Sequence, residues 1–413
     1  MSNITGRLRD YLQSSHLRLI ERASYVVSGR PEKIYLVGGA VRDVLLGITP
    51  INLDIVVVHP REEFINYLAE GIDGEVVSRS QFGTFKVVVN SDEIDIATSR
   101  REEYARPGAL PVVEETSIEE DLGRRDFRVN SMAVSLGQDS WGELLDPHGG
   151  EGDLRQKLLK VLHEDSFIDD PTRILRGIRY SERLNFRIDQ ETYRLLKRDM
   201  VYLQDVSGDR IRNELERAMA EPFAWDVLFR GEQEGVLSAI HPGLRFGRIP
   251  NPLNIQEQQI VGDNDVVLAA LIYFSNDAQM VEVCTRLKID TRWSRVAREV
   301  RSIKSEFGRL GRPDLSRSEL FNLLCDLNPD VVHGCAITIQ DNAVKSNLWL
   351  YLNELRCIRP TIDGDYLLKL GVPEGPQVGE LLDRLLHDRL DGLLSSRADE
   401  EALVANELKL CRD

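Results

Sequence analysis

The sequence has little cysteine and no long apolar run. Its five cysteines (Cys284, Cys325, Cys335, Cys357 and Cys411) form no Cys-x-x-Cys pair and follow no regular spacing. This argues against a zinc site and against a disulfide framework. No apolar run reaches the roughly 18 residues that a membrane helix needs, and the N-terminus shows no apolar segment of the signal-peptide kind. We therefore expect a cytoplasmic protein that does not contact a membrane.

The sequence also lacks an excess of positive charge. Its formal net charge is −16, which argues against nucleic-acid binding through overall charge. Arginine is nevertheless dense between residues 173 and 217. The arginines of this stretch are Arg173, Arg176, Arg179, Arg183, Arg187, Arg194, Arg198, Arg210, Arg212 and Arg217. An acidic protein with one basic face binds RNA by shape and phosphate contacts at that face.

The most informative pattern lies in residues 33–58. An apolar strand runs directly into Gly38 and Gly39, a helix follows over 40–46, and a second apolar strand carries Asp54 near its start. The glycines let a ligand approach the backbone, and the helix start directs N–H groups and partial positive charge at that ligand. The pattern predicts a triphosphate beside carboxylates that bind Mg²⁺, as two-metal nucleotidyl transfer requires. For the turn alone, the alternative is a corner between a strand and a helix in which the glycines serve only close packing.

Four motifs in this chain resemble those of the class II tRNA nucleotidyltransferase and bacterial poly(A) polymerase family. Residues 38–43 match Gly-Gly-x-Val-Arg-Asp, and residues 52–54 (Asn-Leu-Asp) stand at the family's Asp-x-Asp. Residues 124–133 match Arg-Arg-Asp-Phe-Thr-x-Asn-Ala-Met-Ala, and residues 169–173 match Glu-Asp-x-x-Arg. The resemblance implies an enzyme that adds nucleotides to the 3′ acceptor end of tRNA, with CTP and ATP as substrates and two Mg²⁺ ions.

The resemblance places the catalytic, metal-binding carboxylates at Asp54 and Asp95. Asp95 lies in residues 93–98, where acidic and apolar side chains alternate, so that Glu93 and Asp95 share one face of a strand. A strand with a solvated acidic face is the alternative for that segment alone. Asn52 replaces the family's first carboxylate, and its amide oxygen can bind Mg²⁺ without contributing charge. The enzyme then works with weaker metal binding, or it is a silent RNA binder, or an aspartate was deliberately replaced to trap a complex.

The same motifs imply a set of nucleotide contacts. In the first motif these are Gly38, Gly39, Arg42 and Asp43. Arg124 and Arg125 suit a triphosphate or ribose, because cations are favourable where negative charge accumulates. Asp126 and Asn130 suit the sugar hydroxyls, and bracing between strands fits these two residues equally well.

Residues 99–123 contain Pro107-Gly108 and Pro111 and show no stable period. A long segment without regular structure inside a compact domain is usually a working loop or disordered. This segment resembles the flexible loop that family members use in the switch from C to A addition.

Residues 169–183 predict a helix that reads bases. Pro171 marks its start, and Arg173, Arg176 and Arg179 recur every three residues as further nucleotide contacts. Asp170 lies beside Arg173 on the same face. A carboxylate that accepts and a guanidinium that donates match the amino donor and ring-nitrogen acceptor shared by cytosine and adenine, but not uracil or guanine. The alternative is an arginine-rich solvated helix with local ion pairs. Asp169 stands where the family has Glu, as a brace for Arg173.

The predicted fold is α+β, with a small mixed-sheet nucleotidyltransferase head followed by an all-helical neck, body and tail. We expect an N-terminal helical extension (1–32), the catalytic head (33–160), a base-recognising neck (161–245) and a tRNA-binding body and tail (260–413), with a turn-rich boundary at 245–259. Helical patterns occur at 264–276, 278–287, 292–309, 316–327, 339–355 and 378–390. Residues 362–379 resemble a hairpin that lies near the RNA in longer relatives. No histidine–aspartate phosphohydrolase signature occurs, so we predict no phosphatase activity.

The leading hypothesis is a template-independent tRNA nucleotidyltransferase that adds C, A or both. The alternatives within this class are enzymes that add only CC or only A, and poly(A) polymerase. The alternative outside it is a catalytically silent tRNA-binding homologue, because Asn52 replaces a catalytic aspartate.

Overall fold

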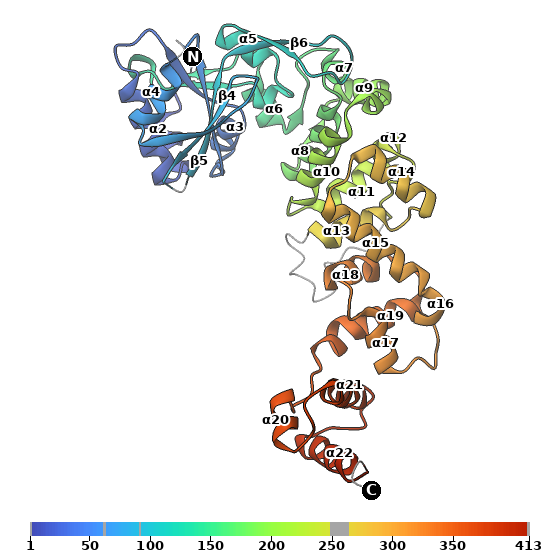
Figure 1. Cartoon of the computed structure of the whole chain (residues 1–413). Helices are drawn as coiled ribbons and strands as arrows, with labels where there is room; N and C mark the ends of the chain where they lie inside the picture. Colours follow the sequence, from blue (N-terminus) through green and yellow to red (C-terminus); the bar gives the residue numbers. More distant parts are fainter. Residues whose placement is uncertain (1, 61–62, 91, 248–263, 411–413) are drawn as a thin grey trace. The chain divides into compact units, whose positions relative to one another are not determined.

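The computed structural model describes residues 2–60, 63–90, 92–247 and 264–410. The chain forms two compact units, residues 1–214 and 215–413 (Figure 1). The first unit contains a mixed sheet, and the described part of the second is helical, which confirms the predicted α+β class. The four domain boundaries remain predictions, and most of the boundary segment expected at 245–259 lies outside the described residues.

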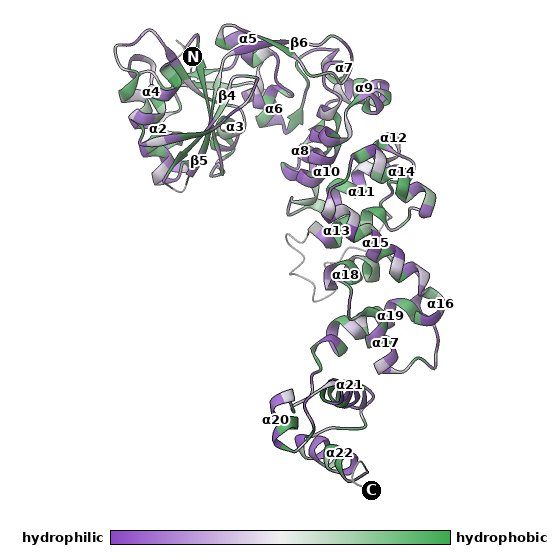
Figure 2. Ribbon diagram, viewed as in Figure 1, coloured by the Kyte–Doolittle hydropathy of each residue, from purple (hydrophilic) through white to green (hydrophobic). Residues whose placement is uncertain are grey.

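A seven-stranded mixed sheet forms the centre of the first unit, in the order β3-β4-β5-β2-β1-β8-β9. The strands are β1 (Lys33–Val37), β2 (Leu53–Val58), β3 (Gly74–Arg79), β4 (Thr84–Val89), β5 (Asp92–Thr98), β8 (Ala133–Ser135) and β9 (Leu144–Leu145). β2 and β5 pair in parallel, and the other neighbours are antiparallel. The strands near the sheet centre are largely hydrophobic in Figure 2, as expected where both faces of a sheet are covered.

Five helices accompany this sheet. They are α1 (Thr5–Tyr11), α2 (Ser14–Val26), α3 (Gly39–Leu46), α4 (Phe64–Gly71) and α5 (Ile118–Gly123). α5 buries Ile118 and Leu122 against Val37 and Val56 of the central strands. α1 and α2 form the helical structure expected in residues 1–32.

The prediction of an irregular segment at 99–123 is wrong. The structure has a hairpin of β6 (Arg100–Glu103) and β7 (Val112–Glu115), followed by α5. Ser117 caps α5 by accepting a hydrogen bond from the backbone N–H of Glu120. Most residues of its two strands are charged, and Arg101 pairs with Glu114 across the strands. The hairpin therefore lacks the apolar alternation by which a strand is recognised in a sequence.

The rest of the first unit is mainly helical and leads into the second. Its elements are η1 (Arg128–Asn130), η2 (Gln138–Ser140), α6 (Gly150–Gln156), β10 (Leu158–Leu159), α7 (Ser166–Asp169), α8 (Thr172–Arg183), β11 (Arg187–Ile188), α9 (Gln190–Asp199), η3 (Met200–Asp205) and α10 (Gly208–Met219). α8 begins after Pro171, as predicted, and its arginines make it largely hydrophilic in Figure 2.

The second unit continues as a series of helices. They are α11 (Ala224–Gln233), α12 (Val236–Ile240), α13 (Asn264–Ile272), α14 (Asp277–Leu287), α15 (Thr291–Ser305), α16 (Phe307–Leu310), α17 (Arg317–Leu324), α18 (Pro329–Thr338), α19 (Asn342–Asn353), η5 (Leu355–Cys357), α20 (Gly364–Lys369), α21 (Pro376–Leu390) and α22 (Arg397–Leu410). The sequence patterns did not indicate α18 or α22. α18 is buried on nearly every side, so its sequence has no polar face to mark a helical period. Across the described ranges, no helix combines the length and apolarity needed to cross a membrane.

Candidate functional site

A cavity of about 490 Å³ lies within the first unit, at the end of the sheet where α3 begins. Its lining includes every predicted site residue except Asp95 and Arg179. The lining residues are Gly38, Gly39, Ala40, Arg42, Asp43, Ile51, Asn52, Asp54, Glu102, Tyr104, Arg124, Arg125, Asp126, Asn130, Asp170, Arg173, Arg176, Tyr180 and Arg183. Residues from the sheet, the hairpin and α8 therefore share one space.

The turn between β1 and α3 forms one wall of the cavity. Gly38 has a φ of +70°, and a Cβ atom placed on it would lie 2.8 Å from Nη1 of Arg125. Only glycine suits this position, because its backbone is left-handed and a guanidinium lies directly against it. α3 starts at Gly39, so the N–H groups of its first turn face the N-terminal end of the helix. The turn thus has the form of an anion-binding corner.

Asp54 and Asp95 lie side by side on the parallel strands β2 and β5. Burial raises the pKa of Asp54 above its usual value, Arg125 opposes this shift, and Asp95 adds to it. Asn52 lies two residues before Asp54, at the entrance to β2, and also lines the cavity. The sheet therefore places two carboxylates side by side, and the residue before β2 brings an amide to the same cavity as Asp54.

These three side chains fit Mg²⁺. Proteins usually bind this ion through one or two carboxylates, with substrate phosphates and water completing the shell. The raised pKa of Asp54 indicates a carboxylate that a cation would stabilise in its ionised form. In the part of the chain that the structure describes, no three His, Cys, Asp or Glu side chains gather in a metal-binding group. An ion here would therefore depend on phosphate oxygens for part of its shell.

Asp121 holds the two predicted phosphate-binding arginines. It is fully buried, and it accepts hydrogen bonds from Arg124 at 2.7 Å and from Arg125 at 3.0 Å. Although burial favours its protonated form, these two guanidinium groups keep the pKa of Asp121 below its usual value. Asp121 belongs to none of the predicted site motifs. It precedes Arg124 by three residues and Arg125 by four. This is the spacing of ion pairs along a helix, and it could have indicated these contacts.

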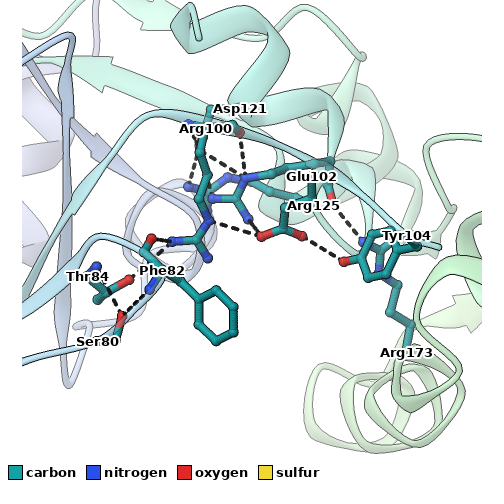
Figure 3. Close-up of polar contacts among 10 residues, drawn as sticks. Ser80, Phe82, Thr84, Arg100, Glu102, Tyr104, Asp121, Arg125 and Arg173 are labelled. Atoms are coloured by element: carbon teal, nitrogen blue, oxygen red, sulfur yellow. Dashed lines mark hydrogen bonds and ion pairs between the residues drawn. The ribbon is translucent and has the colours of Figure 1, made fainter. Parts of the chain in front are cut away.

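The hairpin adds a second carboxylate to this arginine network, as Figure 3 shows. Glu102 accepts hydrogen bonds from Arg124 at 2.9 Å and from Arg100 at 3.0 Å. The hydroxyl group of Tyr104 donates to the same carboxylate at 2.7 Å. The sequence analysis missed Glu102 and Tyr104, because it assigned their segment no regular structure. The hairpin thus contributes an acid and an aromatic ring to the cavity lining.

Asp126 and Asn130 connect the head sheet to α8. Arg176 donates Nε and Nη2 to Oδ2 of Asp126, at 2.9 and 2.6 Å. Asn130 donates to the other oxygen of Asp126 at 2.9 Å and accepts from Arg42 at 2.8 Å. Burial opposes ionisation of Asp126, but Arg176 and Asn130 outweigh it and lower the pKa of Asp126 to about 2. In this structure, Asp126 and Asn130 therefore link helices α8 and α3, whereas the sequence suggested bracing between strands; their contacts with the sugar hydroxyls remain a prediction.

Asp170 and Arg173 both line the cavity, and other groups hold each of them. Arg173 donates to the carbonyl and hydroxyl oxygens of Ser166, at 3.2 and 2.7 Å, and to the carbonyl oxygen of Arg124 at 2.7 Å. A guanidinium carries five N–H donors, so these contacts leave two for a ligand. Asp169, expected to brace Arg173, lies 3.8 Å from Nε2 of His163 and interacts electrostatically with Arg173.

Arg179 and Asp95 do not line the cavity. Arg179 is buried, forms an ion pair of 3.6 Å with Glu214 and lies 4.7 Å from the ring centre of Tyr180. Asp95 is beside Asp54 on the neighbouring strand. Roles of these two residues in nucleotide and metal binding remain predictions.

Comparison with known proteins identifies relatives of the whole chain. Two family profiles match: the poly A polymerase head domain over residues 34–160, and the probable RNA- and SrmB-binding site of polymerase A over residues 185–246. An A-adding tRNA nucleotidyltransferase of Geobacter sulfurreducens is 34% identical over 390 residues, which are 89% of this chain and 44% of that protein. An A-adding tRNA nucleotidyltransferase of Halalkalibacterium halodurans is 30% identical over 407 residues, which are 96% and 94% of the two chains.

A solved structure agrees with these relatives. The Thermotoga maritima CCA-adding enzyme complexed with tRNA-CCA has a TM-score of 0.78 and 27% identity, covering 98% of this chain and 99% of that one. The chain spans less than half the length of the Geobacter relative, whereas it spans nearly all of the other two proteins. From the motifs, the fold and these matches, the chain belongs to the family of tRNA nucleotidyltransferases and bacterial poly(A) polymerases.

Proposed function

We propose that this protein is a template-independent nucleotidyltransferase that adds A, C or both to the 3′ end of tRNA. One observation carries the proposal: a single cavity is lined by the glycine turn, Asp54, the paired arginines and the Asp170/Arg173 pair. This combination provides places for a triphosphate, a reacting centre and a base. The predicted cytoplasmic location is part of the same proposal.

The proposed reaction is attack of the terminal 3′ hydroxyl oxygen of tRNA on the α-phosphorus of the nucleotide. A new P–O bond forms, the bond to the bridging oxygen breaks, pyrophosphate leaves, and the hydroxyl proton passes to water. Arg124 and Arg125 stabilise negative charge on the phosphates, and Asp121 fixes their positions beforehand. Asp54, Asp95 and Asn52 would hold Mg²⁺, which would supply further charge neutralisation and a lower pKa for the attacking hydroxyl group.

The base is selected by the protein in this proposal. A carboxylate oxygen of Asp170 accepts the exocyclic amino group of adenine or cytosine, and a free N–H of Arg173 donates to the ring nitrogen. Each such contact is worth about 1–3 kcal/mol of discrimination. Uracil and guanine place a carbonyl oxygen opposite Asp170, so they are rejected.

Addition of A is the favoured form of the activity. The two relatives compared above are both named A-adding tRNA nucleotidyltransferases, which supports ATP as the main substrate. The similarity to a CCA-adding enzyme along nearly the whole chain supports CTP as well. Nucleotide choice is therefore part of the test.

The second candidate function is tRNA binding without catalysis. Asn52 favours it, because the amide removes one negative charge from the expected metal site. Everything else that lines the cavity fits either function. The two candidates differ only in whether a nucleotide is transferred.

An incorporation assay separates these functions. The protein is incubated with Mg²⁺, one labelled nucleotide at a time, and tRNAs that end at the discriminator base, at C or at CC. We expect A to be added to the tRNA ending in CC, and addition of C to the shorter tRNAs would show the full CCA activity. Asp54→Ala serves as the inactive control. Binding of tRNA without incorporation, by both the natural chain and Asn52→Asp, contradicts the enzymatic proposal.

A further inference from the structure

Arg210 connects the base-reading carboxylate to the hairpin. It lies in the first turn of α10 and donates Nη2 to Oδ1 of Asp170 at 2.8 Å. Its Nη1 donates to the carbonyl oxygen of Gly108 at 3.1 Å. Neither the motifs nor the proposed reaction assigns Arg210 a role.

The two oxygens of Asp170 have different surroundings. Oδ1 accepts from the backbone N–H of Thr172 at 3.0 Å, from its hydroxyl group at 2.6 Å and from Arg210. Three donors fill the acceptor capacity of one carboxylate oxygen. Among the described residues, no donor bonds Oδ2, and Asp170 lines the cavity. Oδ2 is therefore the oxygen left for a base.

Arg210 is itself held in place on its far side. Gly108 has a φ of +69°, and a Cβ atom on it would lie 3.0 Å from the backbone of Asp205 and Val206. The loop of the hairpin is thus packed tightly against the segment that precedes α10. Because both ends of the Arg210 fork are anchored, the guanidinium can keep the Asp170 carboxylate in one rotamer.

We infer that Arg210 is a positioning residue that sets nucleotide selectivity by orienting Oδ2 of Asp170 toward the base. The inference rests on the proposed function, because it requires Asp170 to read adenine or cytosine. Without Arg210, only the two Thr172 donors hold Oδ1, so the orientation of the carboxylate is less firmly fixed. The amino group of A or C then loses a preorganised acceptor, whereas the triphosphate contacts at the glycine turn and Arg125 are unaffected.

The test measures equilibrium binding of ATP, CTP, UTP, GTP and inorganic tripolyphosphate to the full chain with Mg²⁺. In Arg210→Met we expect the preference for A and C over U and G to fall by about tenfold, the size of one base contact. Affinity for tripolyphosphate should stay unchanged, because this probe has no base. Arg210→Lys should recover part of the preference, since it restores the charge without the fork. Arg155→Met removes an exposed arginine paired with Glu151 and serves as the matched control.

Three other outcomes would each overturn the inference. An unchanged nucleotide preference in Arg210→Met, with a selective natural chain, overturns the inference and leaves the proposed function intact. A parallel loss of tripolyphosphate affinity assigns Arg210 a merely structural role and also overturns it. A natural chain that binds all four nucleotides equally contradicts base reading by Asp170, and the inference about Arg210 then fails with it, whereas the incorporation assay still decides whether a nucleotide is transferred. Thr172→Val, which removes only the hydroxyl donor to Oδ1, provides a second variant if Arg210→Met does not fold.

Discussion

Arg176 donates two hydrogen bonds to a single oxygen of Asp126, at 2.9 and 2.6 Å. The arginine comes from α8, and the aspartate follows α5 at the edge of the cavity. Asp126 is 7% exposed, so this contact is a nearly buried ion pair within the first unit. It fixes the base-reading helix relative to the residues that face the phosphates.

Replacing Asp126 by Asn should destabilise the protein by about 3 kcal/mol, because it leaves the guanidinium of Arg176 with only a longer ion-pair contact, of 3.8 Å, to Glu214 among the described residues. We expect a lower denaturant midpoint at pH 7, measured by circular dichroism. Glu191→Gln is the control, since it removes an exposed ion pair with Arg194 and should change stability by no more than about 0.5–1 kcal/mol. Equal effects of the two substitutions would show that the Asp126–Arg176 contact does not hold the helix.

The sequence allowed prediction of those parts of the site that depend on local pattern. The glycine turn, β2 with Asp54 and the start of α8 follow from apolar runs, turn residues and a proline, each read within a short window. The adjacency of Asp54 and Asp95 could be stated only with the resemblance, because parallel pairing of β2 with β5 joins distant segments.

The remaining parts depend on contacts that no local pattern encodes. Arg101 and Glu114 stabilise the hairpin from opposite strands, so neither strand shows a period by itself. The contact from Arg210 to Asp170 spans 40 residues, and its partners carry no shared motif. Helix α18 is buried on nearly every side, so its sequence lacks the separate polar and apolar faces by which an amphipathic helix is recognised.

Gly38→Ala should weaken nucleotide binding. A left-handed backbone costs a non-glycine residue about 1–2 kcal/mol, and the new Cβ atom would lie 2.8 Å from Arg125, which must move. We expect the dissociation constant for ATP to rise at least about tenfold, measured by equilibrium dialysis. Gly152→Ala is the matched control, because a Cβ atom added there would meet nothing within 4 Å and the residue lies inside α6. An unchanged ATP affinity in Gly38→Ala would remove the glycine turn from the binding site.

Asn52→Asp should lower the Mg²⁺ requirement. The substitution restores a charged oxygen ligand beside Asp54, and hard divalent cations favour carboxylates over amides. We expect the Mg²⁺ concentration for half-maximal incorporation to fall by on the order of tenfold. Gln81→Glu adds the same charge on an exposed turn and should leave the titration unchanged. Identical Mg²⁺ curves for Asn52→Asp and the natural chain would place the metal away from this side chain.

The Asp126–Arg176 pair also predicts how stability depends on pH. The pKa of Asp126 is lowered to about 2 in the folded protein, against about 3.9 in an unfolded chain. A lowered carboxyl pKa contributes stability that is fully present above the pKa of the unfolded chain. This stability is lost as the pH falls through the pKa of the folded protein. The contribution at neutral pH is about 2–3 kcal/mol.

Unfolding of the natural chain and Asp126→Asn is therefore compared from pH 7 to pH 2, because the difference isolates this group from other carboxylates. We expect the gap between them to stay constant down to about pH 4 and to shrink below it. A gap that is the same at pH 2.5 and at pH 7 would mean that the ionised form of Asp126 does not stabilise the fold.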